Sequence, residues 1–182
     1  MRYDVVIIGG GLAGITAGLQ LQKSGKRTVV ISAGLSLHET PRSEYVAAGG
    51  TILAGDTVEG GSFTEGRLDY VRTHNLGSTP MYADSFILCT GKFFSKGLVS
   101  TMDRVFEPVF GCDVQYDHDR TAWALPDFSS EQPFMSFGVT TDEKGRVSIG
   151  GSTVENLYAA GEILAGKVDI TESALKVCRN LI

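Results

Sequence analysis

The stretch DVVIIGGGLAG, residues 4–14, decides the fold. Its four apolar residues, Val5 to Ile8, run directly into three glycines, as a buried parallel strand does before a tight turn. Residues 12–23 then place apolar side chains at helical spacing, and Gly25 ends that segment. Residues 28–31 (TVVI) form a second apolar run. Strand, glycine turn, helix and strand in this order predict a βαβ unit with a right-handed crossover.

The glycines of this turn follow the pattern G-x-G-x-x-G at Gly9, Gly11 and Gly14. The first glycine permits the sharp turn, the second lets the backbone approach a pyrophosphate, and the third lets helix and strand pack closely. The helix N-terminus offers free N–H groups and a positive dipole end to phosphates. Because the pattern follows a strand and opens a helix, it predicts dinucleotide binding rather than an empty turn of the same shape.

The second strand ends without the acidic residue that usually binds the ribose about 20 residues after the glycines. Ser32, Ala33 and Gly34 stand there instead. A serine hydroxyl can still form a hydrogen bond with a ribose, but it carries no charge. The only nearby arginine, Arg27, precedes the strand, so the pattern does not point to NADP.

Two later segments also end in a glycine turn. Residues 83–90 lead into Thr90-Gly91, and the strand-like residues 156–160 lead into Gly161-Glu162. Together with the N-terminal turn they form the three-part signature of flavoproteins with two dinucleotide folds. We therefore predict an α/β fold with a doubly wound parallel sheet of the FAD/NAD(P)-binding Rossmann type.

Shorter segments complete the expected architecture. Residues 51–53, 57–58 and 68–72 are short strand-like runs between glycines and predict a small antiparallel β-meander. A hairpin is expected from residues 137–140 and 146–149, and a terminal helix over residues 173–182. Prolines break the region from Pro108 to Pro133, which predicts a loop-rich excursion.

Composition excludes several classes of protein. The chain has 182 residues, 42% of them hydrophobic, and a net charge of −5. These values predict one folded domain over residues 1–182 and argue against nucleic-acid binding, because no basic face can neutralise phosphates. No apolar run approaches the length of a membrane span, and the N-terminus lacks the anatomy of a signal peptide. Three scattered cysteines predict a cytoplasmic protein without disulfides or iron–sulfur ligands.

No catalytic residue and no metal site is assigned from the sequence. The three histidines, His38, His74 and His118, have no metal-like spacing to another ligand. A flavin carries its own hydride chemistry while the protein supplies position and electrostatics, so a missing catalytic side chain does not contradict an oxidoreductase.

The sequence resembles the B subunit of anaerobic glycerol-3-phosphate dehydrogenase. The resemblance covers most of residues 1–38 and 83–166, and its most specific stretches are residues 1–14, 18–25, 90–98, 107–114 and 137–143. It implies a flavin site, with FAD or FMN as the cofactor. The implied cofactor-binding residues are Gly9, Gly10, Gly11, Leu12, Ala13, Gly14, Ser32, Ala33, Val58, Thr90, Gly91, Gly161 and Glu162. Ser32 and Ala33 would lie near the ribose, Val58 near the adenine and Glu162 on a ribitol hydroxyl.

The resemblance also implies an activity and partners. Members of the family join a catalytic flavoprotein A subunit and an iron–sulfur C subunit at the cytoplasmic face of the membrane. The complex oxidises glycerol 3-phosphate to dihydroxyacetone phosphate and passes electrons towards quinone. Two alternatives remain open: an NAD-dependent oxidoreductase, against which Gly161-Glu162 argues, and a non-catalytic interaction subunit on a Rossmann scaffold, which the missing acid favours.

Two departures from the family bear on the cofactor. After about residue 38 the family carries a large substrate domain that this chain lacks. After Gly166 the family has a glycine-rich turn whose helix points at the flavin ring, whereas here Lys167 to Glu172 include three β-branched and two acidic residues. We therefore expect this chain to hold a flavin more weakly than its longer relatives.

Overall fold

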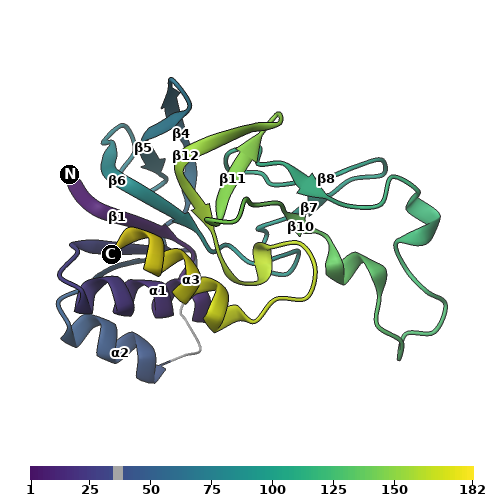
Figure 1. Cartoon of the computed structure of the whole chain (residues 1–182), viewed down its shortest axis with the longest axis horizontal. Coiled ribbons are helices and arrows are strands. Elements are labelled where there is room, and N and C mark those ends of the chain that lie inside the picture. The colour runs from purple at the N-terminus through teal and green to yellow at the C-terminus, as the bar shows by residue number, and fades with distance from the viewer. Residues whose placement is uncertain (35–38) are drawn as a thin grey trace.

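The computed structural model describes residues 1–34 and 39–182 (Figure 1). His38, and the point at which the family's substrate domain would enter, lie outside the described residues. β1 (Arg2–Ile8), α1 (Leu12–Lys23) and β2 (Thr28–Ser32) form the βαβ unit that the N-terminal sequence predicts. The bounds of α1 match the expected helix because its apolar spacing, its opening glycine and Gly25 are all local signals.

The central sheet has the strand order β11-β12-β6-β1-β2-β3. Five neighbouring strands run parallel: β12 (Ser152–Ala159), β6 (Met81–Leu88), β1, β2 and β3 (Thr51–Ala54). β11 (Arg146–Ile149) adds an antiparallel edge. Ile7 lies between Val30 and Ile87 in register, so the two glycine-turn strands β1 and β6 share one sheet as expected.

The two faces of the sheet are covered differently (Figure 1). α1, α2 (Glu39–Ala47) and α3 (Ile170–Leu181) lie on one face, where Ile7, Val30 and Ile87 pack against Ile15 and Val177. On the other face the antiparallel strands β4 (Val58–Thr64) and β5 (Arg67–Thr73) join β6 as the predicted meander. The fold class is therefore confirmed, with helices over one face and β-structure over the other.

Residues 92–140 leave the sheet and form a lobe, which we call the excursion (Figure 1). It contains only short elements: β7 (Val99–Ser100), β8 (Val105–Phe106), β9 (Val114–Gln115), η1 (Arg120–Ala122), η2 (Pro133–Ser136) and β10 (Gly138–Val139). The loop-rich character predicted for residues 108–133 is confirmed, because this range holds only β9, η1 and the start of η2. The chain then returns through β11 and β12 to η3 (Gly161–Ile163) and α3.

Two strand assignments were wrong. Residues 51–53 belong to β3, which pairs in parallel with β2 and takes no part in the antiparallel meander. The predicted hairpin of residues 137–149 forms only next to its turn, where Gly145 N–H donates to Asp142 O at 2.9 Å and Thr141 bridges Val147 in antiparallel fashion. The named strands on either side of this turn have other partners. β10 pairs with β9, and β11 pairs with β12. β3 and β10 pair with strands that lie much earlier in the chain, whereas β11 pairs with β12, which follows it directly. The local alternation of side chains does not distinguish these partners from the expected ones.

The helix α2 was not expected, and one buried side chain explains its position. Tyr45 is fully buried, and its hydroxyl lies 2.9 Å from Thr28 Oγ1 and donates to Thr51 O at 3.2 Å. Its ring occupies the space where a side chain at Gly18 or Gly50 would be. Tyr45 thus holds α2 against α1 and the start of β3.

Candidate functional site

Three glycine turns meet at the carboxyl ends of the parallel strands. Cys89 N–H donates to Ile8 O at 2.7 Å, and Ala160 N–H donates to Leu88 O at 3.0 Å, so the turns after β1, β6 and β12 leave the sheet side by side. A side chain at Gly161 would come closer than 3.0 Å to Ala13. The structure therefore brings together the residues that the sequence predicts at 9–14, 90–91 and 161–162, at the edge where α/β sheets bind ligands.

The glycines of the first turn have different physical roles. Gly9 has a φ of +112°, and a side chain there would clash with the main chain of Cys89. A side chain at Gly14 would clash with the carbonyl of Gly9. Gly10 leaves room for the Ser32 side chain. These three glycines serve the protein's own packing, which agrees with the expected turn and the expected close helix–strand contact.

Gly11 differs from its neighbours. A Cβ atom there would meet nothing within 4 Å, and its φ of −72° suits any residue. The protein's own packing does not require a glycine at this position. The open space lies in front of the α1 N-terminus, where a ligand phosphate would approach the backbone.

The N-terminus of α1 is free to bind an anion. The N-cap residue Gly11 has no side-chain hydrogen bond, and the first turn contains no acidic residue. The first amides of a helix have no intrahelical acceptor, and the helix dipole attracts negative charge. The pyrophosphate of FAD fits these properties, since it supplies the acceptors and the charge that the helix end lacks.

Of the residues expected near the adenosine, two are largely buried within the protein. Ser32 is 8% exposed, and its hydroxyl donates to Gly34 O at 2.7 Å within its own loop. Ala33 is exposed. Val58 is 8% exposed and packs in the core cluster that includes Ile31, so its side chain is part of the protein interior.

The second turn holds a buried polar atom that has no partner. Thr90 Oγ1 forms no hydrogen bond with any described residue, and Gly97 lies directly against it. Gly91 has a φ of +70°, and a Cβ built on it would lie 3.8 Å from Glu162 Oε2. Glu162 itself is exposed. The second and third turns therefore place a carboxylate beside a glycine backbone, an arrangement that suits a ligand hydroxyl.

Lys92 belongs to this site although the sequence did not suggest it. Its ammonium group donates to Met135 O of the excursion. Burial lowers the pKa of Lys92 below its usual range, while the nearby Glu162 carboxylate opposes that shift. The position directly after Thr90-Gly91 is the one signal that could have indicated it.

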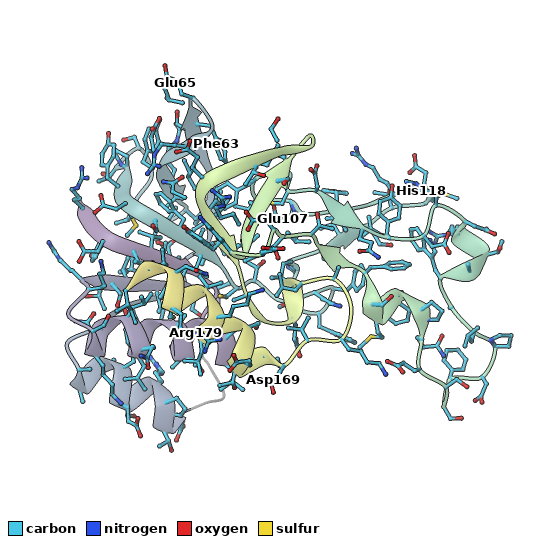
Figure 2. The ribbon with its side chains drawn as sticks, in the orientation of Figure 1. Phe63, Glu65, Glu107, His118, Asp169 and Arg179 are labelled. Carbon is cyan, nitrogen blue, oxygen red and sulfur yellow. The ribbon has the colours of Figure 1, made fainter. Side chains whose placement is uncertain are left out.

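The third turn and the start of α3 are held by hydrogen bonds within the protein. Gly161 N–H donates to Ser173 Oγ at 2.9 Å, and Asp169 caps α3 by accepting from Glu172 N–H at 2.8 Å. Figure 2 shows Asp169 at the start of α3 and Arg179 further along it, where Arg179 pairs with Glu172. A cavity of about 240 Å³ lies beside this turn, lined by Gln115, Val139, Thr140, Thr141, Leu164, Ala165 and Val168.

Other kinds of site are not found in the part of the chain that the structure describes. No group of three or more histidine, cysteine or acidic side chains is arranged to hold a metal ion there. None of the described helices is long and apolar enough to cross a bilayer. Cys89, Cys112 and Cys178 are all buried as free thiols, and burial raises the pKa of each.

Comparison with known proteins identifies relatives of this chain. The chain is 37% identical over 144 residues to the B subunit of anaerobic glycerol-3-phosphate dehydrogenase from Vibrio vulnificus, an alignment that covers 78% of this chain and 33% of that protein. The corresponding B subunit from Pectobacterium atrosepticum is 39% identical over 133 residues, covering 73% of this chain and 31% of that protein. The resemblance seen in the sequence is thus confirmed, and the chain spans about a third of the length of these relatives.

The fold is shared with a solved thioredoxin reductase, and a family model matches most of the chain. A thioredoxin reductase from Gloeobacter violaceus superposes with a TM-score of 0.60 at 14% identity, covering 99% of this chain and 93% of that one. The model described as "FAD binding domain" matches residues 4–71 and 42–174. Its name supports FAD as the cofactor. Because these two segments together span residues 4–174, the chain belongs to the FAD binding domain family.

Proposed function

We propose that this chain binds FAD with the pyrophosphate on the N-terminus of α1, as the flavin-carrying part of a subunit of anaerobic glycerol-3-phosphate dehydrogenase. One observation carries the proposal: α1 begins without a cap, and Gly11 leaves open space in front of it. When bound, the flavin accepts and donates hydride or electrons. The protein's contribution is to hold it at the ends of β1, β6 and β12.

Each turn has a separate task in this proposal. The amides of Gly11, Leu12 and Ala13 bind the phosphates, while Gly9, Gly10 and Gly14 allow the turn to fold. Gly91 lets the backbone approach the cofactor beside Thr90, whose unpaired hydroxyl is buried beneath Gly97. Gly161 positions Glu162, whose carboxylate accepts a hydrogen bond from a ribitol hydroxyl. Ser32, Ala33 and Val58 border the adenosine.

The ring end of the site binds more weakly than the phosphate end. One α3 amide, that of Glu172, already donates to the Asp169 carboxylate, and this carboxylate would also repel the negative charge of a reduced flavin. The missing acid after β2 reduces the advantage of FAD over FMN, because FMN has no adenosine ribose. The match to the FAD binding domain family nevertheless favours FAD.

The wider role follows from the relatives, which are B subunits of anaerobic glycerol-3-phosphate dehydrogenase. We propose that the complex converts glycerol 3-phosphate to dihydroxyacetone phosphate and passes electrons towards quinone. This chain would relay electrons between a flavoprotein A subunit and an iron–sulfur C subunit, in the cytoplasm at the inner face of the membrane. Membrane association would come from those partners.

Three measurements test the proposal. The purified chain, mixed with FAD and passed through a desalting column, should keep the flavin absorption bands, and chromatography should identify the released cofactor as FAD. Equal retention of FMN would assign the site to the shorter cofactor. Retention of NAD instead of either flavin would make the chain a nicotinamide enzyme.

A second candidate function is a scaffold subunit that holds no cofactor. Two hydrogen bonds within the protein favour this candidate. The Asp169 carboxylate caps α3, and the hydroxyl of Ser32 donates within its own loop. Co-purification with the A and C subunits in a colourless state, together with no flavin retention, would establish this candidate and reject the first.

A further inference from the structure

A second cavity lies in the excursion, away from the α1 N-terminus. Its volume is about 380 Å³, which falls within the range of small-molecule sites. Four segments form its walls: the loop after β6, β7, η1 with the residues that follow it, and η2. Three of the lining side chains are aromatic: Phe93, Trp123 and Phe134.

The aromatic walls are held in place by the surrounding structure. Trp123 is 9% exposed, its indole N–H donates to Asp117 O at 2.6 Å, and its ring packs edge-on against Phe137 with centroids 5.7 Å apart. Phe134 N–H donates to Trp123 O at 3.0 Å, and its ring packs edge-on against Phe93. The cavity is therefore preformed, and a planar ligand would order few side chains on binding.

One cation borders the cavity. The Arg120 guanidinium lies over the Trp123 ring, 4.9 Å from its centroid, and its Nη1 donates to the main-chain oxygens of Thr101 and Met102. None of the described ion pairs involves Arg120. Its neighbour Asp119 accepts instead from the N–H and hydroxyl of Thr121. A guanidinium whose described partners are neutral oxygens still attracts an anion.

Arg120 and Ser100 give the aromatic cavity a polar and charged rim. Ser100 also lines the cavity and adds a polar residue to its wall. We propose that this cavity binds a planar aromatic molecule that carries an anionic group, with its rings against Trp123 and Phe134 and its anion on Arg120. This inference does not rest on the flavin proposal.

The single tryptophan of the chain makes the proposal directly measurable. Anilinonaphthalene sulfonate is an aromatic anion with a planar naphthalene ring, and N-phenylnaphthylamine is its uncharged counterpart. We expect saturable energy transfer from Trp123 to both probes and at least about fivefold tighter binding of the sulfonate, since charge-assisted hydrogen bonds are roughly twice as strong as neutral ones. Equal binding of the two probes would remove the anionic part of the proposal, and no saturable transfer would overturn it.

Matched variants locate the two parts of the site. Arg120→Gln should weaken sulfonate binding at least about fivefold and leave the uncharged probe unaffected, whereas Ala124→Phe should block both probes by filling the cavity. Arg104→Gln is the control, because Arg104 also stacks on an aromatic ring, Phe106, but does not line the cavity. Circular dichroism verifies that each variant folds, and a variant that fails to fold is replaced by Trp123→Phe with the probe's own emission as the readout. An unchanged affinity in both Arg120→Gln and Ala124→Phe would place the probes elsewhere and overturn the proposal.

A competition experiment separates this cavity from the flavin site. Saturating FAD should leave sulfonate affinity unchanged if the two sites are distinct. Displacement of the probe by FAD would show that the cavity is part of the cofactor site and would overturn the proposal of a separate ligand, whereas failure of FAD to bind at all would leave the probe result standing.

Discussion

The N-termini of α1 and α3 are built in opposite ways, although both helices have 12 residues and lie together on one face of the sheet (Figure 1). α1 begins at a glycine with no side-chain cap and no acidic residue in its first turn. α3 begins at Asp169, whose carboxylate accepts from Glu172 N–H, and Glu172 adds a second acid to the first turn. One helix end is thus uncapped, and the other has a side-chain carboxylate bound to one of its first amides.

This difference indicates where binding energy comes from. A helix N-terminus stabilises a nearby negative charge by about 0.3–1 kcal/mol when exposed and up to about 2 kcal/mol when partly buried. The end of α1 can give this stabilisation to a pyrophosphate. The end of α3 already gives it to Asp169, so a flavin ring there would lose up to about thirtyfold in affinity. The molecule should therefore hold its cofactor mainly by the phosphates.

The first prediction tests whether the two helices stay packed as one layer. Cys178 of α3 is fully buried and donates to Ala17 O of α1 at 3.6 Å, and burial raises its pKa to about 12. Because only the thiolate reacts, we expect iodoacetamide at pH 8 to modify Cys178 about a thousandfold more slowly in the native chain than in urea. Peptide mapping by mass spectrometry measures this. Equal rates in the two states would show that α3 separates readily from α1.

The second prediction separates the structural and ligand-facing glycines of the first turn. Gly14→Ala places a Cβ against the Gly9 carbonyl and should lower the free energy of unfolding by about 3 kcal/mol or more. Gly11→Ala meets no protein atom and should change it by less than about 0.5 kcal/mol. Urea unfolding of both variants provides the comparison. A large loss at Gly11, or none at Gly14, would contradict the assignment of roles.

The third prediction concerns the capped end and has the smallest expected effect. Asp169→Asn keeps a side-chain cap but removes the charge, so we expect FAD to bind about threefold more tightly with little change in stability. Asp169→Ala also removes the cap and should cost about 1 kcal/mol in unfolding free energy. Asp127→Asn is the control, since Asp127 accepts from Ser129 N–H in the excursion, and its neutralisation changes the net charge equally. Equal FAD affinities in Asp169→Asn and wild type would show that residues 167–172 do not limit binding.

The parts of the fold that the sequence predicts are those with local signals. The apolar run of β1, the glycine turn and α1 are adjacent in sequence, and each restricts the backbone by itself. The strands that end at Thr90 and Gly161 are predicted for the same reason. β3 was assigned to the wrong pairing because a short, partly exposed edge strand has the same alternation in parallel and antiparallel sheets.

Other features depend on partners that only the folded chain supplies. α2 contains a proline and buries one side chain, Tyr45, whose pocket is made by Gly18 and Gly50 from other elements. Glu107 is 1% exposed and accepts four main-chain N–H groups from residues 109–112, near the centre of the view in Figure 2. A buried acceptor such as Glu107 leaves no periodic pattern in the sequence from which its position could be predicted. At the candidate site, the three turns were predicted, but the contacts of Lys92 and Asp169 were not. Lys92 donates to Met135 O of a distant segment, and the Asp169 cap depends on the backbone geometry at the start of α3.

The most direct test of the account is the FAD affinity of Gly11→Glu beside that of Gln20→Glu. Gly11 has open space and an ordinary φ, so the new side chain should not disturb the fold, whereas its carboxylate would occupy the place of the pyrophosphate. Gln20 is exposed near the other end of the same helix, so the Gln20→Glu substitution adds the same charge away from the site. We predict about hundredfold weaker FAD binding for Gly11→Glu, unchanged binding for Gln20→Glu, and melting temperatures close to that of wild type. Wild-type affinity for FAD in a folded Gly11→Glu variant would contradict the placement of the phosphates on α1.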